Sequence, residues 1–221
     1  MIPAILATVV VLTPQCADMP MRAATTWTYQ ARVSWAVAGS ATTRDTILTW
    51  TTRILTTIQR DSSIVAVVEN WPSSLAWWDP SHAPDTTLLV CRNNRVYHLR
   101  GGRGEGGSAV AEATSGALSL TSDNLILALP LHERMLYGQG PTDRADTFYG
   151  WFVEAAAPMP SALVRLGASA QDSLYTIAYR TVPDHQIVQF APRLGVTRYT
   201  YAHHGTVATA SATLVSARVS P

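Results

Sequence analysis

Apolar and polar residues alternate along much of the chain, most clearly between residues 196 and 215. Two alternating runs meet there at His204-Gly205, which suits a tight turn because glycine adopts positive φ freely and histidine tolerates it. Pairing across this turn places Tyr199 and Tyr201 on the same face as a row of smaller residues, Ala208, Ala210, Ala212 and Leu214. We therefore predict a long β-hairpin whose aromatic and alanine rows fill space against a core.

The same period of two predicts further strands on both sides of the chain's middle. In residues 25–37 one face carries Trp27, Tyr29, Ala31, Val33, Trp35 and Val37, and Gly39-Ser40 marks the turn that follows. The other predicted strands are 46–59, 64–69, 144–155, 174–181 and 185–190, together with a hairpin over 86–99 that turns at Asn93-Asn94. Asparagine populates left-handed φ more readily than most residues, as such a turn requires.

Two stretches depart from the strand pattern. Residues 125–129, before Pro130, fit either a short helix or a buried strand, and we predict a helical turn. Residues 101–116 open with GGRGEGG, which lacks the Lys-Ser/Thr ending of a phosphate loop, so we expect a flexible connector. Residues 25–221 should thus form a single, mainly all-β domain with roughly nine or ten strands and one or two short helices.

The N-terminus predicts export. Residues 2–12 form an apolar run too short to span a bilayer but suited to the core of a signal peptide. We expect residues 1–24 to be an export signal or a lipoprotein leader, with lipid attachment at Cys16 or plain cleavage between Cys16 and Ala24 as alternatives. Thr13-Pro14-Gln15 matches a lipoprotein signal poorly. A buried strand or helix of a cytoplasmic protein is the remaining interpretation.

The expected chemical state of the second cysteine, Cys91, depends on how the N-terminus is processed. If Cys16 is removed or lipidated, Cys91 is left alone in the apolar run LLVC, and a buried free thiol is expected there. A location in the periplasm or at the cell surface follows from export, with the membrane involved only through the N-terminus.

Composition excludes several function classes. Hydrophobic residues make up 47% of the chain and charged residues 14%, enough for a sizeable core. The net charge is +1, all 16 basic residues are arginines, and they are scattered rather than gathered in a stripe, so nucleic acid is not an expected partner.

No motif points to catalysis, a metal or a cofactor. His203 and His204 should diverge at their turn, His132-Glu133 lacks the second histidine of a zinc motif, and Asp184-His185 has no accompanying nucleophile motif. The carboxylates that a glycosidase could use are Glu69, Glu133 and Glu154. For Glu154 the ordinary interpretation is an ion pair with Arg180 on a nearby strand. We expect a protein that is not an enzyme, although a hydrolase using Glu154 or His185 is a third hypothesis.

Residues 70–84 hold three tryptophans, Trp71, Trp77 and Trp78, and three prolines. Such a loop either packs over a sheet edge or lines a surface that contacts a ligand, and we favour packing because large aromatic residues most often serve burial.

Three segments together resemble a group of exported bacterial proteins. They are TWTYQARVSW near the start, LPLHERMLYG followed by DTFYGWFVE in the middle, and QFAPRLGVTRYTYAHHGT before the last strand. Together they resemble half-barrel proteins of the LolA/LolB or DUF3108-like kind. The resemblance implies a curved antiparallel sheet, or half-barrel, whose concave face holds an acyl chain or a hydrophobic peptide.

Our first hypothesis is a non-enzymatic envelope protein, exported or lipid-anchored, that binds lipid or another apolar ligand on a curved sheet. The candidate ligand-binding residues are Trp50, Trp77, Trp78, Tyr199 and Tyr201. The alternative is a structural or interaction subunit of an envelope complex, with no ligand cavity and with the tryptophan-rich loop as its contact surface.

Overall fold

The structure is a computed structural model, and it describes residues 16–37, 42–60, 63–79, 81, 84–100, 119–139, 146–203 and 207–220. The N-terminal half forms β1 (Thr26–Ala36), β2 (Thr43–Arg60), β3 (Ser63–Glu69), β4 (Thr86–Arg92), β5 (Arg95–Arg100) and β6 (Leu125–Ala128). The C-terminal half forms β7 (Leu136–Tyr137), β8 (Trp151–Pro158), β9 (Ser173–Arg180), β10 (Asp184–Ala191), β11 (Gly195–His203) and β12 (Val207–Arg218). Short helical segments are η1 (Pro72–Trp77), η2 (Ser122–Asn124) and α2 (Ser161–Arg165). The mainly all-β prediction is confirmed.

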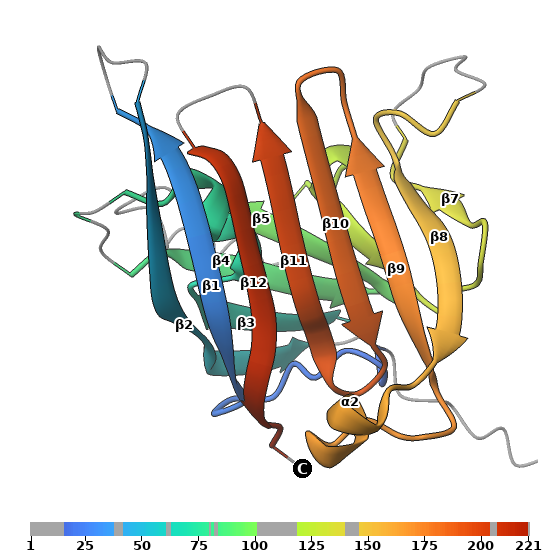
Figure 1. The fold of residues 1–221 in the computed structure, drawn as a ribbon. Coiled ribbons are helices and arrows are strands. Elements are labelled where there is room, and N and C mark those ends of the chain that lie inside the picture. Colours follow the sequence, from blue (N-terminus) through green and yellow to red (C-terminus); the bar gives the residue numbers. More distant parts are fainter. Residues whose placement is uncertain are drawn as a thin grey trace, which may run out of the picture.

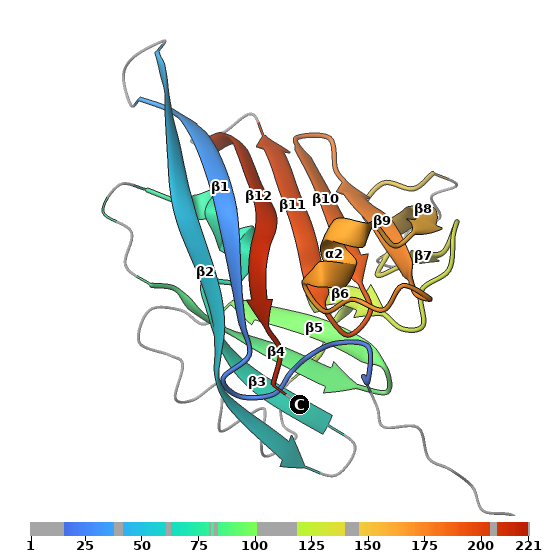
Figure 2. The same cartoon turned by 60° about the horizontal axis from the view of Figure 1, so that its bottom comes forward.

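The twelve strands of the described residues belong to one antiparallel sheet in the order β6-β5-β4-β3-β2-β1-β12-β11-β10-β9-β8-β7. The sheet bends on itself into a nearly closed, barrel-like shape: β1 and β8 to β12 form one wall, and β3 to β5 cross behind it (Figures 1 and 2). The long strand β2 makes the corner, because residues 43–53 pair with β1 and residues 53–60 pair with β3.

Neighbours in the sheet are also neighbours in the sequence, with one exception: the first strand, β1, pairs with the last, β12. The two ends of the sheet are therefore β6 and β7, which follow each other in the middle of the chain. The hydroxyl of Tyr137 in β7 donates a hydrogen bond of 3.1 Å to the Ile126 carbonyl in β6, which links the two ends of the sheet.

Aromatic residues on β1 bind the start of β11, which belongs to the same wall. Trp27 is 1% exposed, and its Nε1–H donates to the carbonyl of Leu194 at 2.6 Å. The Tyr29 hydroxyl donates to the carbonyl of Val196 at 2.9 Å. Between these acceptors Gly195 has φ +100°, a conformation that glycine adopts without strain, and the Trp27 ring lies directly against it.

The predicted final hairpin is confirmed in its register. Tyr199 lies opposite Ala212 and Tyr201 opposite Ala210, and all four side chains are buried. The expected place of Ala208 in the buried row is wrong. The register against β1 shifts there, so that Val207 rather than Ala208 is the buried residue at the end of the strand. The predicted turns at His204-Gly205 and Gly39-Ser40 lie outside the described residues.

The hairpin over 86–99 is also confirmed, since Asn93 and Asn94 have φ of 53° and 59°. Two other expectations are wrong. Residues 125–128 form β6 instead of a helical turn, because this apolar run pairs with β5. The strand expected over 144–155 begins only at Trp151, after a turn in which Tyr149 has φ +58°.

Residues 16–24 pack against the domain rather than extending from it. Cys16, Met19 and Met21 are buried, and the Arg193 N–H donates to the carbonyl of Asp18 at 2.7 Å. Cys16 forms a disulfide with Cys91 on β4, with Cα atoms 6.4 Å apart. The expectation of a free thiol at Cys91 is therefore wrong. The apolar run 2–12 and the connector 101–116 lie outside the described residues.

No helix in the described part of the chain is long and apolar enough to cross a membrane.

Candidate functional site

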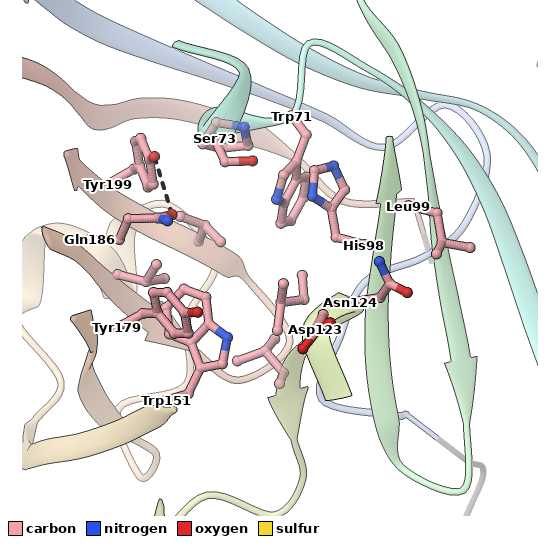
Figure 3. Close-up of a pocket in the computed structure, with 15 residues that line it drawn as sticks. Trp71, Ser73, His98, Leu99, Asp123, Asn124, Trp151, Tyr179, Gln186 and Tyr199 are labelled. Carbon is pink, nitrogen blue, oxygen red and sulfur yellow. Dashed lines mark hydrogen bonds between the residues drawn. The ribbon is translucent and has the colours of Figure 1, made fainter. Parts of the chain in front are cut away.

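A cavity of about 470 Å³ lies between the two walls of the bent sheet (Figure 3). Fifteen residues line it, from the segment that enters η1, from β5, η2 and β6, and from strands β8 to β11. They are Trp71, Pro72, Ser73, His98, Leu99, Asp123, Asn124, Ile126, Leu127, Trp151, Tyr179, Gln186, Val188, Val196 and Tyr199. β6, at one end of the sheet, and β8, next to the other end, both contribute, so the bend of the sheet brings the two sides of the cavity together.

Aromatic rings form opposite sides of this space. Trp151 on β8 and Tyr179 on β9 have ring centroids 5.1 Å apart, and Trp71 lies with His98 on another side at 6.2 Å (Figure 3). Aliphatic side chains, among them Ile126 and Leu127, and several polar residues complete the lining. Cavities of this size with a mixed lining hold small organic ligands in many proteins.

Hydrogen bonds from β2 hold the segment that carries Trp71 in place. The carbonyl of Asn70 accepts hydrogen bonds from Trp50 Nε1 at 2.8 Å and from Thr52 Oγ1 at 2.6 Å, and Asn70 has φ +54°. The η1 turn then packs on β11 and β12, with Leu75 fully buried. This anchoring holds Trp71 and Ser73 at the cavity wall.

A few polar groups face the cavity. Tyr199 donates to Gln186 Oε1 at 3.4 Å, as Figure 3 shows. The Oγ of Ser73 is buried and has no hydrogen-bond partner among the described residues. The pKa of Tyr179 is raised, first by burial and then by the negative charges of Asp123 and Asp184. A phenol with a raised pKa stays neutral, so Tyr179 offers the cavity an uncharged hydroxyl.

The five predicted ligand-binding residues occupy different environments. Tyr199 lines the cavity, but Trp50 and Tyr201 do not and are buried elsewhere in the core. Trp78 packs edge-on against Trp35 with centroids 4.9 Å apart, and Trp77 is 65% exposed.

Sequence analysis did not select Trp151, Tyr179 and His98 for the site. The available signal for Trp151 was the alternation of its strand, which places it on the same face as Val153. Alternation does not distinguish a ring that packs against core from one that faces a hollow.

Two of the candidate catalytic groups, Glu154 and Asp184, have structural partners. The ion pair between Glu154 and Arg180 is confirmed, at 2.7 Å. Asp184 accepts a hydrogen bond of 3.0 Å from the Tyr201 hydroxyl and pairs with His203, whose ring stacks on Tyr201. Within the described residues, no group of three or more His, Cys, Asp or Glu is placed to hold a metal ion.

Comparisons with known proteins give little beyond this. No protein-family model and no curated protein matches the sequence, so membership in the LolA/LolB or DUF3108-like groups stays a prediction.

Two solved structures are similar over most of the chain. One, from Bacteroides fragilis, is provisionally described as an exported protein with a YmcC-like fold; it is 8% identical with a TM-score of 0.42, covering 92% of this chain and 99% of its own. The other, from Parabacteroides distasonis, is provisionally described as a lipoprotein; it is 10% identical with a TM-score of 0.38, covering 93% of this chain and 100% of its own. Matches at this level establish no shared function.

Proposed function

We propose that this protein is a non-enzymatic binder of an apolar ligand, which it holds in the cavity between the two walls of its bent sheet. The observation that supports this is the cavity itself: about 470 Å³ lined by aromatic, aliphatic and a few polar side chains from both walls of the sheet.

Binding of a neutral apolar fluorophore, N-phenylnaphthylamine, tests the proposal. The fluorophore should bind saturably and brighten. Val188→Phe adds a ring to a half-buried side chain of the lining and should weaken binding by at least about tenfold, because it occupies ligand volume. Val182→Phe, the same exchange at a position that is 77% exposed and outside the lining, is the matched control and should bind as the parent does.

Equal binding by both variants would contradict the proposal, as would no binding by the folded parent protein. Mass spectrometry of the natively purified protein should in addition detect a small apolar molecule that is absent from Val188→Phe.

Export to the cell envelope is the second part of the proposal. Disulfides persist in oxidising compartments and are rare in the cytosol, so the Cys16–Cys91 bond favours an exported protein. Cleavage before Cys16 keeps this bond, whereas cleavage after it removes the bond, and cleavage beyond Met19 also removes that buried side chain.

Lipid attachment at Cys16 is an alternative to the disulfide, since one sulfur atom cannot carry a thioether and a disulfide together. Intact mass of the envelope protein, before and after reduction, separates the two. A gain of two hydrogens on reduction supports the disulfide, and the added mass of a lipid supports the anchor.

A second function, contact with an envelope protein, is favoured by one observation. Trp77 at the end of η1 is 65% exposed, which is unusual for so large an apolar side chain. A photo-reactive residue placed at Trp77 should then cross-link a defined partner in intact cells, and one placed at Val182, which is 77% exposed, should not. Equal cross-linking from both positions would reject this function.

A further inference from the structure

The charge around the cavity limits which apolar ligand it can hold. Among its described lining residues, Asp123 is the only one with a carboxylate, and none is an arginine, although the chain has 16. The headgroup of a fatty acid, a phosphate or a sulfate would therefore meet a negative charge without a permanent cation to pair with it. Like charges that lie close together repel each other, so this carboxylate disfavours an anionic head.

The aromatic walls favour the opposite charge. The faces of tryptophan and tyrosine rings carry negative electrostatic potential and attract cations that lie within about 6 Å of the ring centre. Trp151 and Tyr179 present two adjacent rings with centroids 5.1 Å apart. Asp123 and Asn124 lie on the other side of the space from this pair, as Figure 3 shows.

The negative charge of Asp123 also acts on Tyr179, one member of this aromatic pair. It is one of the groups that raise the pKa of Tyr179, after burial. Asp123 itself is exposed, so it marks the solvent side of the cavity, whereas Ile126 and Leu127 next to it in sequence face the interior. A negative charge and the Trp151–Tyr179 pair thus line the part of the cavity where a ligand's head would lie, and aliphatic side chains line the part where its tail would lie.

We propose that the ligand is a cationic amphiphile, an alkyl or acyl chain with an amine or quaternary ammonium head, whose head lies between Asp123 and the Trp151–Tyr179 pair. This rests on the proposed function of the cavity and specifies its ligand class. The tail fills the apolar part of the cavity, and the head remains close enough to the opening to keep part of its hydration.

Three probes with the same tail and different heads test the charge preference: decyltrimethylammonium, decyl glucoside and decyl sulfate, each used as monomers. Affinities are measured by calorimetry at about pH 8, above the ordinary pKa range of histidine. The cation should bind about tenfold more tightly than the anion, with the neutral probe between them. Because Asp123 is exposed, added salt should reduce this ratio.

Asp123→Asn should bring the cation-to-anion ratio down about fivefold while leaving the neutral probe unchanged. Glu133→Gln is the matched control: it removes one negative charge from an exposed residue of the same segment that does not line the cavity, and it should leave the ratio as it is.

The outcomes separate this inference from the proposed function. If all three probes bind with similar affinity, or the sulfate binds best, the cavity binds apolar ligands but the charge preference is wrong. An unchanged ratio in Asp123→Asn, or the same change in Glu133→Gln, also overturns it. If none of the probes binds and N-phenylnaphthylamine does not bind either, the proposed function falls.

Discussion

Removing the Cys16–Cys91 disulfide is expected to destabilise the domain strongly. The two cysteines are 75 residues apart in sequence, so the bond closes a long loop in the unfolded chain. Loop-closure entropy for that length corresponds to about 4 kcal/mol of stabilisation. This is a large part of the roughly 5–15 kcal/mol by which most domains are stable.

The assay is urea unfolding of four proteins: the parent, Cys16→Ala, Cys91→Ala and the double variant. Each single variant removes the whole cross-link, so the double variant should lose little more than either alone, apart from the small packing loss at the second site. Reduction of the parent should lower the free energy of unfolding by a similar amount. Additive losses in the two single variants, or no loss on reduction of the parent, would refute the reasoning and show that the sulfurs are not bonded in solution.

Three further replacements test other contacts by urea unfolding. Gly195→Ala should lower the free energy of unfolding by about 1–3 kcal/mol, because its φ is +100° and the new Cβ would lie 3.2 Å from Trp27 Nε1; a neutral effect would contradict this geometry. Burial raises the pKa of Tyr29 well above its ordinary value, so stability should hold below about pH 10 and fall at higher pH as the unfolded chain ionises. Tyr29→Phe should weaken that fall and lower the free energy of unfolding by about 1–2 kcal/mol at neutral pH. An unchanged fall of stability above about pH 10 would contradict this role of Tyr29. Glu154→Gln should cost less than about 1 kcal/mol, because its ion pair with Arg180 is partly exposed; a larger loss would give Glu154 a further role.

Period-two alternation was sufficient to predict most strands. It predicted the buried face of β1 and the pairing of Tyr199 and Tyr201 with the alanine row of β12. It failed at residues 125–128, where four apolar residues in a row show no period and fit a helix or a strand equally. Pairing with β5 decided that case, and such pairing depends on residues remote in sequence.

The candidate site was much harder to predict. A core residue and a cavity residue both point inward, so the pattern that correctly buried Trp50 and Tyr201 could not show that Tyr199 alone of these faces a hollow. The cavity arises where the two ends of the sheet face each other, and no local pattern contains that distance. The disulfide was missed because Cys16 was assigned to a leader, which left Cys91 without a partner.

The pairing of β1 with β12 also sets the order in which the protein can fold. During synthesis β1 is made early, but its partner on this side is the last strand, and contacts such as Ser220 N–H to Thr25 Oγ1 span 195 residues. Contacts between such distant residues slow folding, because a long loop must close before they form. The wall that carries β1 therefore cannot be completed on the ribosome until nearly the whole chain has emerged. A nascent chain of this design stays accessible to chaperones for most of its synthesis. Deleting β12 should leave an edge of β1 unpaired and the protein prone to aggregation.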